Sequence, residues 1–426
     1  MTFEASLDYA RRRDAADPLR DMRERFALPQ GADGTPLIYL CGHSLGLQPR
    51  NVAARIAEEL DDWARLAVLA HEHGRRPWVR YHEFLSDGLA RLAGARPDEV
   101  VAMNSLTVNL HLMMATFYRP SGSRTKILIE AGAFASDRHA VVAQLTWHGL
   151  DPATHLIELA PEAGADLVHI DAIRDCLRER GSEIALVLWP GIQFRTGQAF
   201  DLAAIAQAAR AAGCRVGFDL AHAIGNLELA LHDSEADFAV WCSYKYLNAG
   251  PGAIGGCFVH ERHADDASLP RLAGWWGHEL STRFAMRPGF RPAHGAAGWA
   301  VSNPPIFAAT PLLASLELFD EAGIERLRAK SVQLTGFLEF LIERLAPQVQ
   351  IVTPRAPAER GCQLSLRIPG GAARGRRVFE WLGAHGAICD WREPDILRVA
   401  PAPLYNSFED VFRFGELFAR ALEANP

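Results

Sequence analysis

Lysine is scarce in this chain: only Lys126, Lys245 and Lys330 are lysines among 44 basic residues, and the other 41 are arginines. Because arginine is used wherever a positive charge is enough, each lysine position requires its own explanation. Lys330 lies in the charged helical stretch ERLRAKSVQL, which predicts a solvated helix face. Lys126 opens a strand, where a charge is common. Lys245 is therefore the lysine that needs a chemical reason.

Paired cysteines and long hydrophobic runs are also missing. The seven cysteines lie at least 15 residues apart, which excludes a CxxC redox pair and a zinc ribbon. No 18 apolar residues run together, and the charged N-terminal stretch lacks the apolar region of a signal peptide. We expect a cytoplasmic protein without a membrane partner. The net charge of −7 lacks the basic footprint of nucleic-acid binders, so no nucleic-acid partner is expected either.

The 426 residues, 49% hydrophobic and 22% charged, predict a globular chain with one large domain and a smaller satellite. Apolar spacing predicts helices over 50–68, 78–94 and 105–118. Further on, β-rich runs alternate with helical stretches such as LAAIAQAARAAG, a pattern typical of a mostly parallel sheet covered on both faces. The predicted strands are 125–130, 184–189, 215–221, 237–243 and 256–261.

The pattern changes again after about residue 310. A long helical stretch precedes the short strands IVTP and QLSLRI, another helix and the strand-like ILRVAP, which indicates a small α+β domain. We predict an N-terminal helical segment (1–40), a large α/β domain (41–309) and a small C-terminal α+β domain (310–426). Parallel α/β sheets bind ligands at the carboxyl ends of their strands, so functional residues are sought there.

Lys245 follows the strand DFAVWCS directly and lies between Tyr244 and Tyr246. A lysine in partly desolvated, aromatic surroundings can have a lowered pKa and act as a nucleophile that forms a Schiff base. The alternative is a lysine whose stem packs on the tyrosine rings while its ammonium group reaches water.

Asp219 ends a predicted strand 26 residues before Lys245, one strand–helix–strand unit upstream, and His222 follows it. A carboxylate that points into the same crevice as a lysine suits a cofactor with a protonatable ring nitrogen. Without the lysine, the same aspartate would be interpreted as a helix cap. The run Asn104-Ser105-Leu106-Thr107 predicts a helix N-terminus, either merely capped or binding an anion such as phosphate. Phe134, after the strand ending in ILIE, either stacks on a planar ring or belongs to the core.

Two other motifs fail on their context. Gly250-Pro-Gly252-Ala-Ile-Gly255 matches GxGxxG but precedes a strand instead of opening a helix, which excludes a dinucleotide fingerprint. The histidine pairs His71/His73 and His260/His263 lack the spacing that places both histidines of HExxH on one helical face. We expect no catalytic metal.

With these residues assembled, the chain resembles the kynureninase family, fold-type-I pyridoxal-phosphate enzymes of tryptophan catabolism. The resemblance covers nearly the whole chain and is most specific in WCSYKYLNAG and GHELSTRF. It implies a fold-type-I α/β architecture, pyridoxal 5'-phosphate as cofactor, and hydrolysis of kynurenine between Cβ and Cγ to anthranilate and alanine. Further matching stretches are YLCGHSLGLQPR, NSLTVNLHL, TGQAFDL, GFDLAHAIGNLELALHD, SNPPI and RVAPAPLYNSF.

The resemblance also implies residue roles. Lys245 would bind the cofactor covalently, Asp219 would face its ring nitrogen, and Tyr244 would be a candidate acid. Arg398 would pair bidentately with the substrate α-carboxylate. Trp275 and Asn303 would reach the site from the partner subunit, which implies an obligate homodimer. The other implied contacts are Leu106, Thr107, Phe134, Ser136, Asp137 and His222 with the cofactor, and Ser44, His71 and Asn303 with the aryl side of the substrate.

Two departures from the family pattern carry expectations of their own. Gly42-His43-Ser44 stands where relatives usually read Gly-Asn-Ser, so an imidazole titrating near neutrality would replace an amide. Pro190 stands where several relatives have a small polar residue, which removes an N–H contact to the cofactor. Polar groups at His71 and Asn303 predict that 3-hydroxykynurenine is also a substrate.

Rival functions remain open at this point. A class V aminotransferase or a cysteine desulfurase would share the fold and the aspartate and lysine roles. A desulfurase needs a mobile nucleophilic cysteine, whereas Cys242 and Cys257 lie in strand-like runs where a buried, inert thiol is expected. A degenerate member of the fold acting as a binding or scaffold module is the non-enzymatic alternative.

Overall fold

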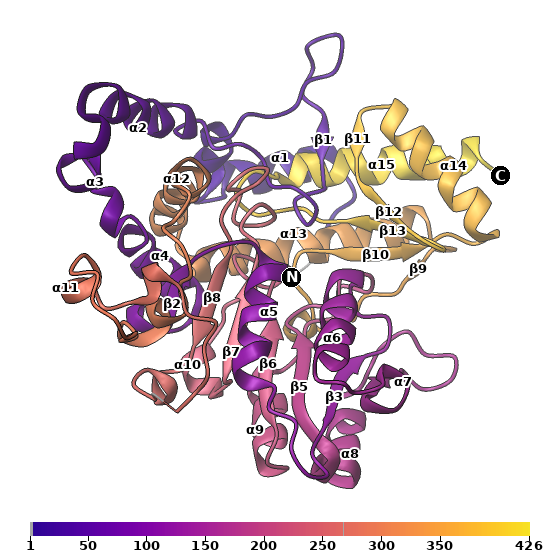
Figure 1. Cartoon of the computed structure of the whole chain (residues 1–426). Coiled ribbons are helices and arrows are strands. Elements are labelled where there is room, and N and C mark those ends of the chain that lie inside the picture. The colour runs from indigo at the N-terminus through magenta and orange to yellow at the C-terminus, as the bar shows by residue number, and fades with distance from the viewer. Residues whose placement is uncertain (1–2, 267) are drawn as a thin grey trace.

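The computed structural model describes residues 3–266 and 268–426. A seven-stranded sheet lies at its centre (Figure 1), in the order β2 (Val100–Ala102), β8 (Gly256–Val259), β7 (Phe238–Trp241), β6 (Arg215–Asp219), β5 (Ile184–Pro190), β3 (Lys126–Glu130) and β4 (Leu156–Leu159). β8 is antiparallel to both of its neighbours, β2 and β7. The pairs formed by β7, β6, β5, β3 and β4 are parallel, which confirms the predicted α/β class with a mostly parallel sheet.

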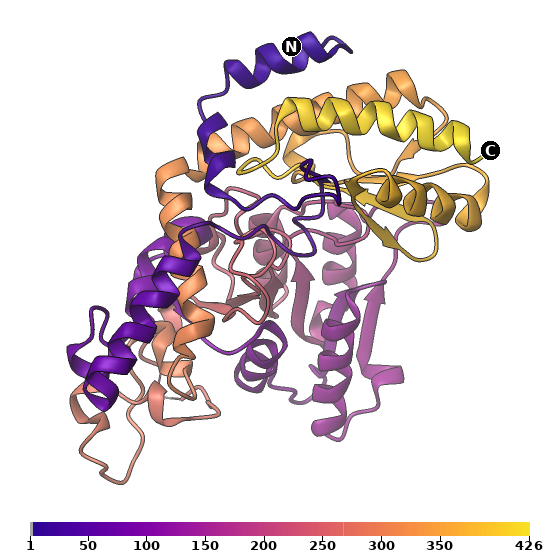
Figure 2. The same cartoon turned by 90° about the horizontal axis from the view of Figure 1, so that it is seen from above.

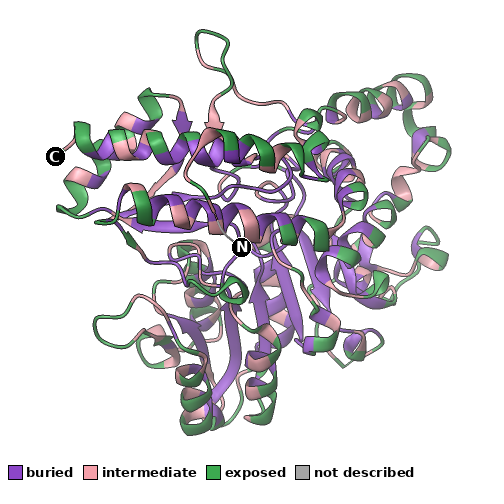
Figure 3. Ribbon diagram, turned by 180° about the vertical axis from the view of Figure 1, so that it is seen from behind, coloured by how far each residue is buried: buried purple, intermediate pink, exposed green. Residues whose placement is uncertain are grey.

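Alternate residues of the central strands enter two different hydrophobic clusters, as a sheet covered on both faces requires. In β5, Leu186 and Leu188 pack in the cluster that contains α5 (Leu106–Phe117) and α6 (Ala135–Trp147). Val187 and Trp189 pack in the cluster that contains α8 (Ile170–Arg180) and α9 (Leu202–Ala211). The strands β5, β6 and β7 are consequently buried along most of their length, as the purple ribbons of Figure 3 show.

The predicted helices and strands of this region are present, with ends that shift by a few residues. The first two helices are α2 (Val52–Leu66) and α4 (Glu83–Ala93), and α12 (Ile306–Ala322) packs against both. The apolar pattern did not predict β2 and β4, which are three and four residues long. The region also contains the one-turn helices α3 (Ala70–His73), α7 (Pro152–His155), α10 (Leu231–Ser234) and α11 (Leu280–Arg283).

A second, antiparallel sheet forms the C-terminal part of the chain. Its order is β12 (Asp390–Arg392), β13 (Ile396–Val399), β10 (Leu364–Arg367) and β9 (Gln350–Ile351). The helices that pack with it are α13 (Ile324–Leu345), α14 (Gly371–Ala384) and α15 (Phe408–Ala424). The domain boundaries at 40 and 309 stay a prediction.

The N-terminal segment lies over this second sheet and its helices (Figure 2). α1 (Leu7–Ala15) packs on α15, and β1 (Ile38–Tyr39) pairs with β11 (Ala387–Ile388). No helix within 3–266 and 268–426 is long and apolar enough to cross a membrane.

Lys330 corrects one expectation. It is 7% exposed and its ammonium group lies 2.7 Å from the Asp17 carboxylate, so it does not belong to a solvated helix face. The N-terminal segment covers that face of α13, which periodicity within 320–335 cannot reveal. Asp14, three residues before Asp17, accepts the backbone N–H groups of Phe408 and Glu409 at the start of α15, which fixes the segment there.

Candidate active site

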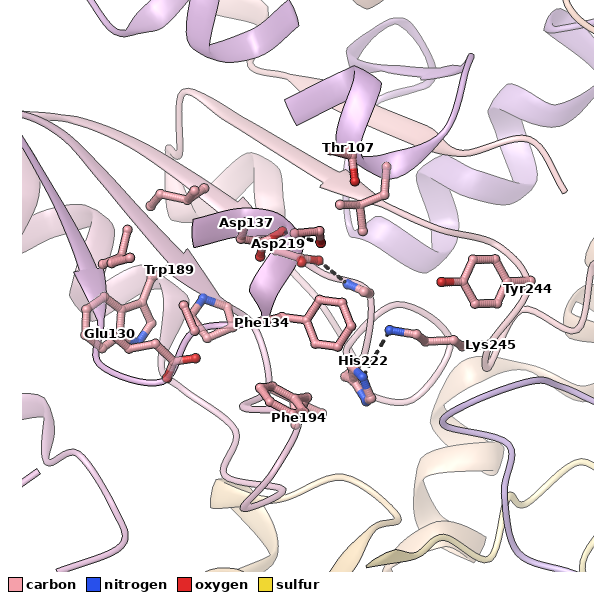
Figure 4. Close-up of a pocket in the computed structure, with 18 residues that line it drawn as sticks. Thr107, Glu130, Phe134, Asp137, Trp189, Phe194, Asp219, His222, Tyr244 and Lys245 are labelled. Carbon is pink, nitrogen blue, oxygen red and sulfur yellow. Dashed lines mark hydrogen bonds between the residues drawn. The ribbon is translucent and has the colours of Figure 1, made fainter. Parts of the chain in front are cut away.

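A pocket lies at the carboxyl ends of the central strands, as expected for an open parallel sheet (Figure 4). Its walls come from the loops after β3, β5, β6 and β7 and from the first turn of α5. Segments more than 100 residues apart thus meet in one cavity. Ten of its lining residues are Leu106, Thr107, Phe134, Ser136, Asp137, Pro190, Asp219, His222, Tyr244 and Lys245.

Lys245 enters the pocket from the tight loop that follows β7. Its Nζ lies 3.1 Å from His222 Nε2 and 5.7 Å from the centroid of the Phe134 ring. The loop is held by an earlier turn of the chain, because the Gly46 N–H donates to the Tyr244 carbonyl at 2.8 Å. A Cβ on Gly46 would lie 2.3 Å from the Lys245 carbonyl oxygen, so only glycine permits this approach.

Asp219 and His222 flank the lysine from the end of β6. The Asp219 carboxylate is 8% exposed and accepts the Ala221 N–H at 2.7 Å. Burial and the nearby Lys245 charge hold the pKa of His222 well below its usual range. A neutral His222 can therefore accept a hydrogen bond from the lysine ammonium, and the predicted group of Lys245, Asp219 and His222 is assembled in space.

Three carboxyl groups line the pocket, and burial together with the charge of Asp219 raises the pKa of the other two. Burial, followed by the charge of Asp219, raises the pKa of Asp137 well above its usual range. Burial also raises the pKa of Glu130 to about 8. Glu130 ends β3, and its carboxyl group accepts a long 3.3 Å hydrogen bond from Gln193 Nε2. The sequence motifs did not single out Glu130, although its place at the end of ILIE, at the same sheet edge as Asp219, was the available indication.

The opposite end of the pocket suits an anion. Leu106 and Thr107 form the first turn of α5, whose N-terminus carries the positive end of the helix dipole. The Thr107 hydroxyl and the Tyr244 ring lie on this side in Figure 4. Burial raises the pKa of Tyr244, which keeps its hydroxyl protonated and able to donate.

Arg398 lies next to this pocket but outside its lining. It is 1% exposed on β13, where Nε donates to Asp390 Oδ2 at 2.7 Å and Nη1 donates to the Phe194 carbonyl at 2.8 Å. Phe194 lines the pocket, so one residue separates the guanidinium from the cavity. Ser44 is half-buried in the turn that holds the Lys245 loop, and it too lies outside the lining.

His43 corrects a second expectation. It is 1% exposed, and burial, followed by the charge of Arg398, lowers its pKa to about 3. The imidazole therefore stays neutral through the physiological range and does not titrate near neutrality. The sequence showed the residue type, but the enclosing arginines, Arg392 and Arg398, come from strands at the other end of the chain.

The remaining predicted residues gather elsewhere. His71, Trp275 and Asn303 line a second, apolar hollow together with Val68, Leu69 and Phe284, which we call the apolar groove. None of them lines the Lys245 pocket of the same chain. Val68 is 73% exposed and Trp275 49% exposed, so the groove is an open surface.

The pocket geometry fits a planar cofactor that carries an aldehyde, a basic ring nitrogen and a phosphate. Lys245 offers the amine, the buried Asp219 a carboxylate for the ring nitrogen, and the start of α5 an anion site. The cysteines do not suit a desulfurase, because Cys242 and Cys257 are buried and burial raises the pKa of both thiols.

Known proteins resemble this chain along nearly its whole length. Residues 327–418 match the family model of the kynureninase C-terminal domain. The chain is 61% identical to a kynureninase from Xanthomonas campestris pv. campestris over 98% of both chains. It is 60% identical to one from Xanthomonas oryzae pv. oryzae, over 97% of this chain and 98% of the relative.

Solved structures share the fold at low sequence identity. A C-DES mutant with glycine covalently linked to the PLP cofactor superposes with a TM-score of 0.77 at 18% identity, covering 93% of this chain and 98% of that one. A cysteine desulfurase from Escherichia coli gives a TM-score of 0.75 at 18% identity, covering 96% and 99%. These likenesses establish the fold-type-I architecture.

Proposed function

The chain belongs to the kynureninase family, and from this premise we propose that it hydrolyses the Cβ–Cγ bond of L-kynurenine to anthranilate and L-alanine. The observation that carries the proposal is the meeting of Lys245, Asp219 and the start of α5 in one buried pocket. The cofactor is pyridoxal 5'-phosphate, whose ring, when bound, withdraws electrons from the substrate α-carbon.

Each end of the pocket would hold one part of that cofactor. We assign the aldehyde end to Lys245, the ring nitrogen to Asp219 and the phosphate to Thr107 with Leu106 and Tyr244. Phe134 is proposed to stack on the ring face, a role supported by the 5.7 Å distance from the centroid of its ring to Lys245 Nζ. His222, Ser136 and Asp137 complete the contacts.

Proton movement would rest on two residues. Lys245 is the group placed to take the α-proton, and the neutral His222 at 3.1 Å can hold a proton of its ammonium by hydrogen bonding. Tyr244 is the proposed acid for the final proton return, which its raised pKa supports because the hydroxyl stays protonated. The Asp219 carboxyl group would accept a hydrogen bond from the protonated ring nitrogen.

Substrate binding would use the walls around this centre. Arg398 is the proposed partner of the α-carboxylate, and Ser44 lies on the turn beside the Lys245 loop. His71 and Asn303, in the apolar groove, are proposed to face the aryl ring from a partner subunit. Hydrogen bonding there would let 3-hydroxykynurenine serve as a second substrate.

We propose a homodimer, which the separation of the two hollows supports. Trp275 and Asn303 are proposed to reach the Lys245 pocket of the partner, so the active site would lie at the subunit interface. The exposed apolar side chains of the groove support this, because soluble monomers rarely leave such a patch uncovered. We also propose that the protein works in the cytoplasm, in tryptophan catabolism or pyridine-nucleotide synthesis.

The direct test incubates the purified holoenzyme with L-kynurenine and follows anthranilate fluorescence, with alanine quantified in parallel. Equal amounts of anthranilate and alanine are expected. Formation of a keto acid instead would indicate an aminotransferase. Absence of any cofactor absorbance after incubation with pyridoxal phosphate would contradict an enzymatic role altogether.

A further inference from the structure

His43 is an enclosed polar side chain with unused hydrogen-bonding capacity. Neither of its ring nitrogens has a hydrogen-bond partner among the residues that the structure describes. Its Nε2 lies 3.9 Å from Asp390 Oδ2, which is too long for a hydrogen bond. A buried polar group without a partner is costly, so such a group in a functional region indicates a ligand that completes it.

The neighbours of His43 show the same feature. Arg398 Nη2 forms an ion pair with Asp390 Oδ2 at 2.5 Å, but this nitrogen makes no hydrogen bond within 3–266 and 268–426. The Tyr246 and Tyr405 hydroxyls are likewise buried and unpartnered in the described part of the chain. Unused donors from four segments therefore converge on one small region beside the pocket.

The charges around His43 sum to a single positive charge. Arg398 comes from β13, Arg392 and Asp390 come from β12, and His222, whose ring centroid is 6.5 Å away, is held neutral by burial. Cys41 faces the same space, and burial raises the pKa of its thiol to about 12. Two guanidinium groups and one carboxylate leave a net charge of +1, which matches a monoanion.

Distances place the two key donors within reach of one carboxylate. The contacts of 3.9 and 2.5 Å both end on Asp390 Oδ2, so His43 Nε2 and Arg398 Nη2 are at most about 6.4 Å apart. Two donors each about 2.8 Å from a different oxygen of one carboxylate can be separated by this much. Asp390 Oδ2 contacts both Nε and Nη2 of Arg398 but accepts a hydrogen bond only from Nε among the described residues, so the N–H groups of Nη2 are left for the ligand.

We propose that His43 is a second donor to the substrate α-carboxylate, acting beside Arg398 and selecting ligands that carry that group. This deepens the proposed function and rests on it. A neutral imidazole contributes an N–H without adding charge, so the subsite stays matched to one carboxylate. An arginine or lysine at this position would leave an excess positive charge.

The experiment compares two ligands of the holoenzyme by calorimetry. 4-Oxo-4-phenylbutanoate keeps the carboxylate and lacks the α-amine, whereas kynuramine keeps the amine and lacks the carboxylate. His43→Leu is expected to weaken binding of the first about tenfold and to leave binding of the second within about twofold. His43→Asn, which can still donate, is expected to recover most of the lost affinity. With L-kynurenine the loss should fall on KM and spare kcat.

His148→Leu serves as the control, because His148 packs edge-on against Tyr118 at the end of α6, away from the site. If His43→Leu does not fold, His43→Phe makes the same comparison with a ring that cannot donate. Equal weakening of both ligands, or unchanged binding of the carboxylate ligand, would overturn the proposal. Absence of anthranilate from the unsubstituted enzyme would overturn the proposed function instead, while the ligand comparison would still decide the role of His43.

Discussion

The Lys245 pocket and the apolar groove are built on opposite principles. The pocket gathers buried titratable groups at strand ends, where Asp219 and His222 are 8% and 7% exposed. The groove gathers apolar side chains on short helical turns, where Val68 and Phe284 are 73% and 52% exposed. The sheet positions the buried groups of the pocket within one chain. The groove leaves its apolar side chains exposed, which supports the proposal that a second copy covers it.

This difference separates the residues proposed for the chemistry from the residues proposed to recognise the substrate. Residues proposed for chemistry, such as Lys245, lie on the rigid sheet edge, whereas residues proposed for aryl recognition, such as His71, lie on the exposed groove. If both serve one active site, two copies of the chain must meet. Substitutions in the Lys245 pocket and in the apolar groove should then impair the enzyme in different ways.

The largest effect is expected for Lys245→Ala. Loss of the only amine proposed to bind the cofactor and move the α-proton should lower kcat by about 10³-fold or more. Anthranilate fluorescence measures the rate, and visible absorbance measures cofactor attachment. Lys126→Ala is the matched control, since Lys126 pairs with Glu183 at the start of β3 and should leave the rate within about twofold.

Phe284→Glu should break the groove while sparing the pocket. Phe284 packs against Trp275 with ring centroids 5.5 Å apart, and a carboxylate there would be buried unpaired in a dimer. We expect monomers by light scattering and about tenfold or greater loss of activity, with cofactor absorbance kept. Trp147→Glu, a change at an 87% exposed side chain on α6, should alter neither. A fully active Phe284→Glu monomer would show that the groove is unnecessary.

Mixing two inactive chains sharpens the comparison. Lys245→Ala and Asn303→Ala homodimers should each be impaired, but random exchange of subunits would create one intact site in each mixed dimer. About a quarter of the unsubstituted activity is then expected to return. If activity stays at the level of the separate variants, Asn303 does not act across the interface.

Glu130 gives the pocket a pH-dependent stability. Its pKa is about 8 in the folded chain and near 4.5 when unfolded, so the folded state binds more protons between these values. Stability should therefore fall as pH rises from about 4.5 to 8, on the order of 5 kcal/mol from this residue. Urea unfolding of Glu130→Gln should lack that part of the decline. Parallel pH profiles for the two proteins would rule out the predicted linkage.

The smallest effect is expected in the groove. His71→Leu removes a polar group proposed to face the aryl ring, and should lower the preference for 3-hydroxykynurenine over kynurenine by about 3- to 10-fold in kcat/KM. Steady-state kinetics on both substrates measure it. A ratio that does not change would place His71 outside the aryl site.

Lys245, Asp219 and Thr107 could be found in the sequence because each lies at a strand end or helix start, and parallel strands bring such ends to one edge. Glu130 was within reach of the same argument. Lys330 was misread as solvated, because local periodicity does not show that a segment from the other end of the chain covers a helix. His43 was misread as titrating near neutrality, since its pKa is lowered by burial and by the charge of Arg398 from a strand of the second sheet.

The sequence by itself thus determined the fold class and the family and predicted the reactive amine, all of which depend on local patterns and residue chemistry. Only the tertiary structure decided which groups are desolvated, which keep unused donors, and which stay outside the pocket. Burial and proton affinity depend on every neighbour in space, and most neighbours of Lys245 and His43 are distant in the chain. Composition drew attention to Lys245 as one of three lysines, but only folding brings His222 and Phe134 close to its amine.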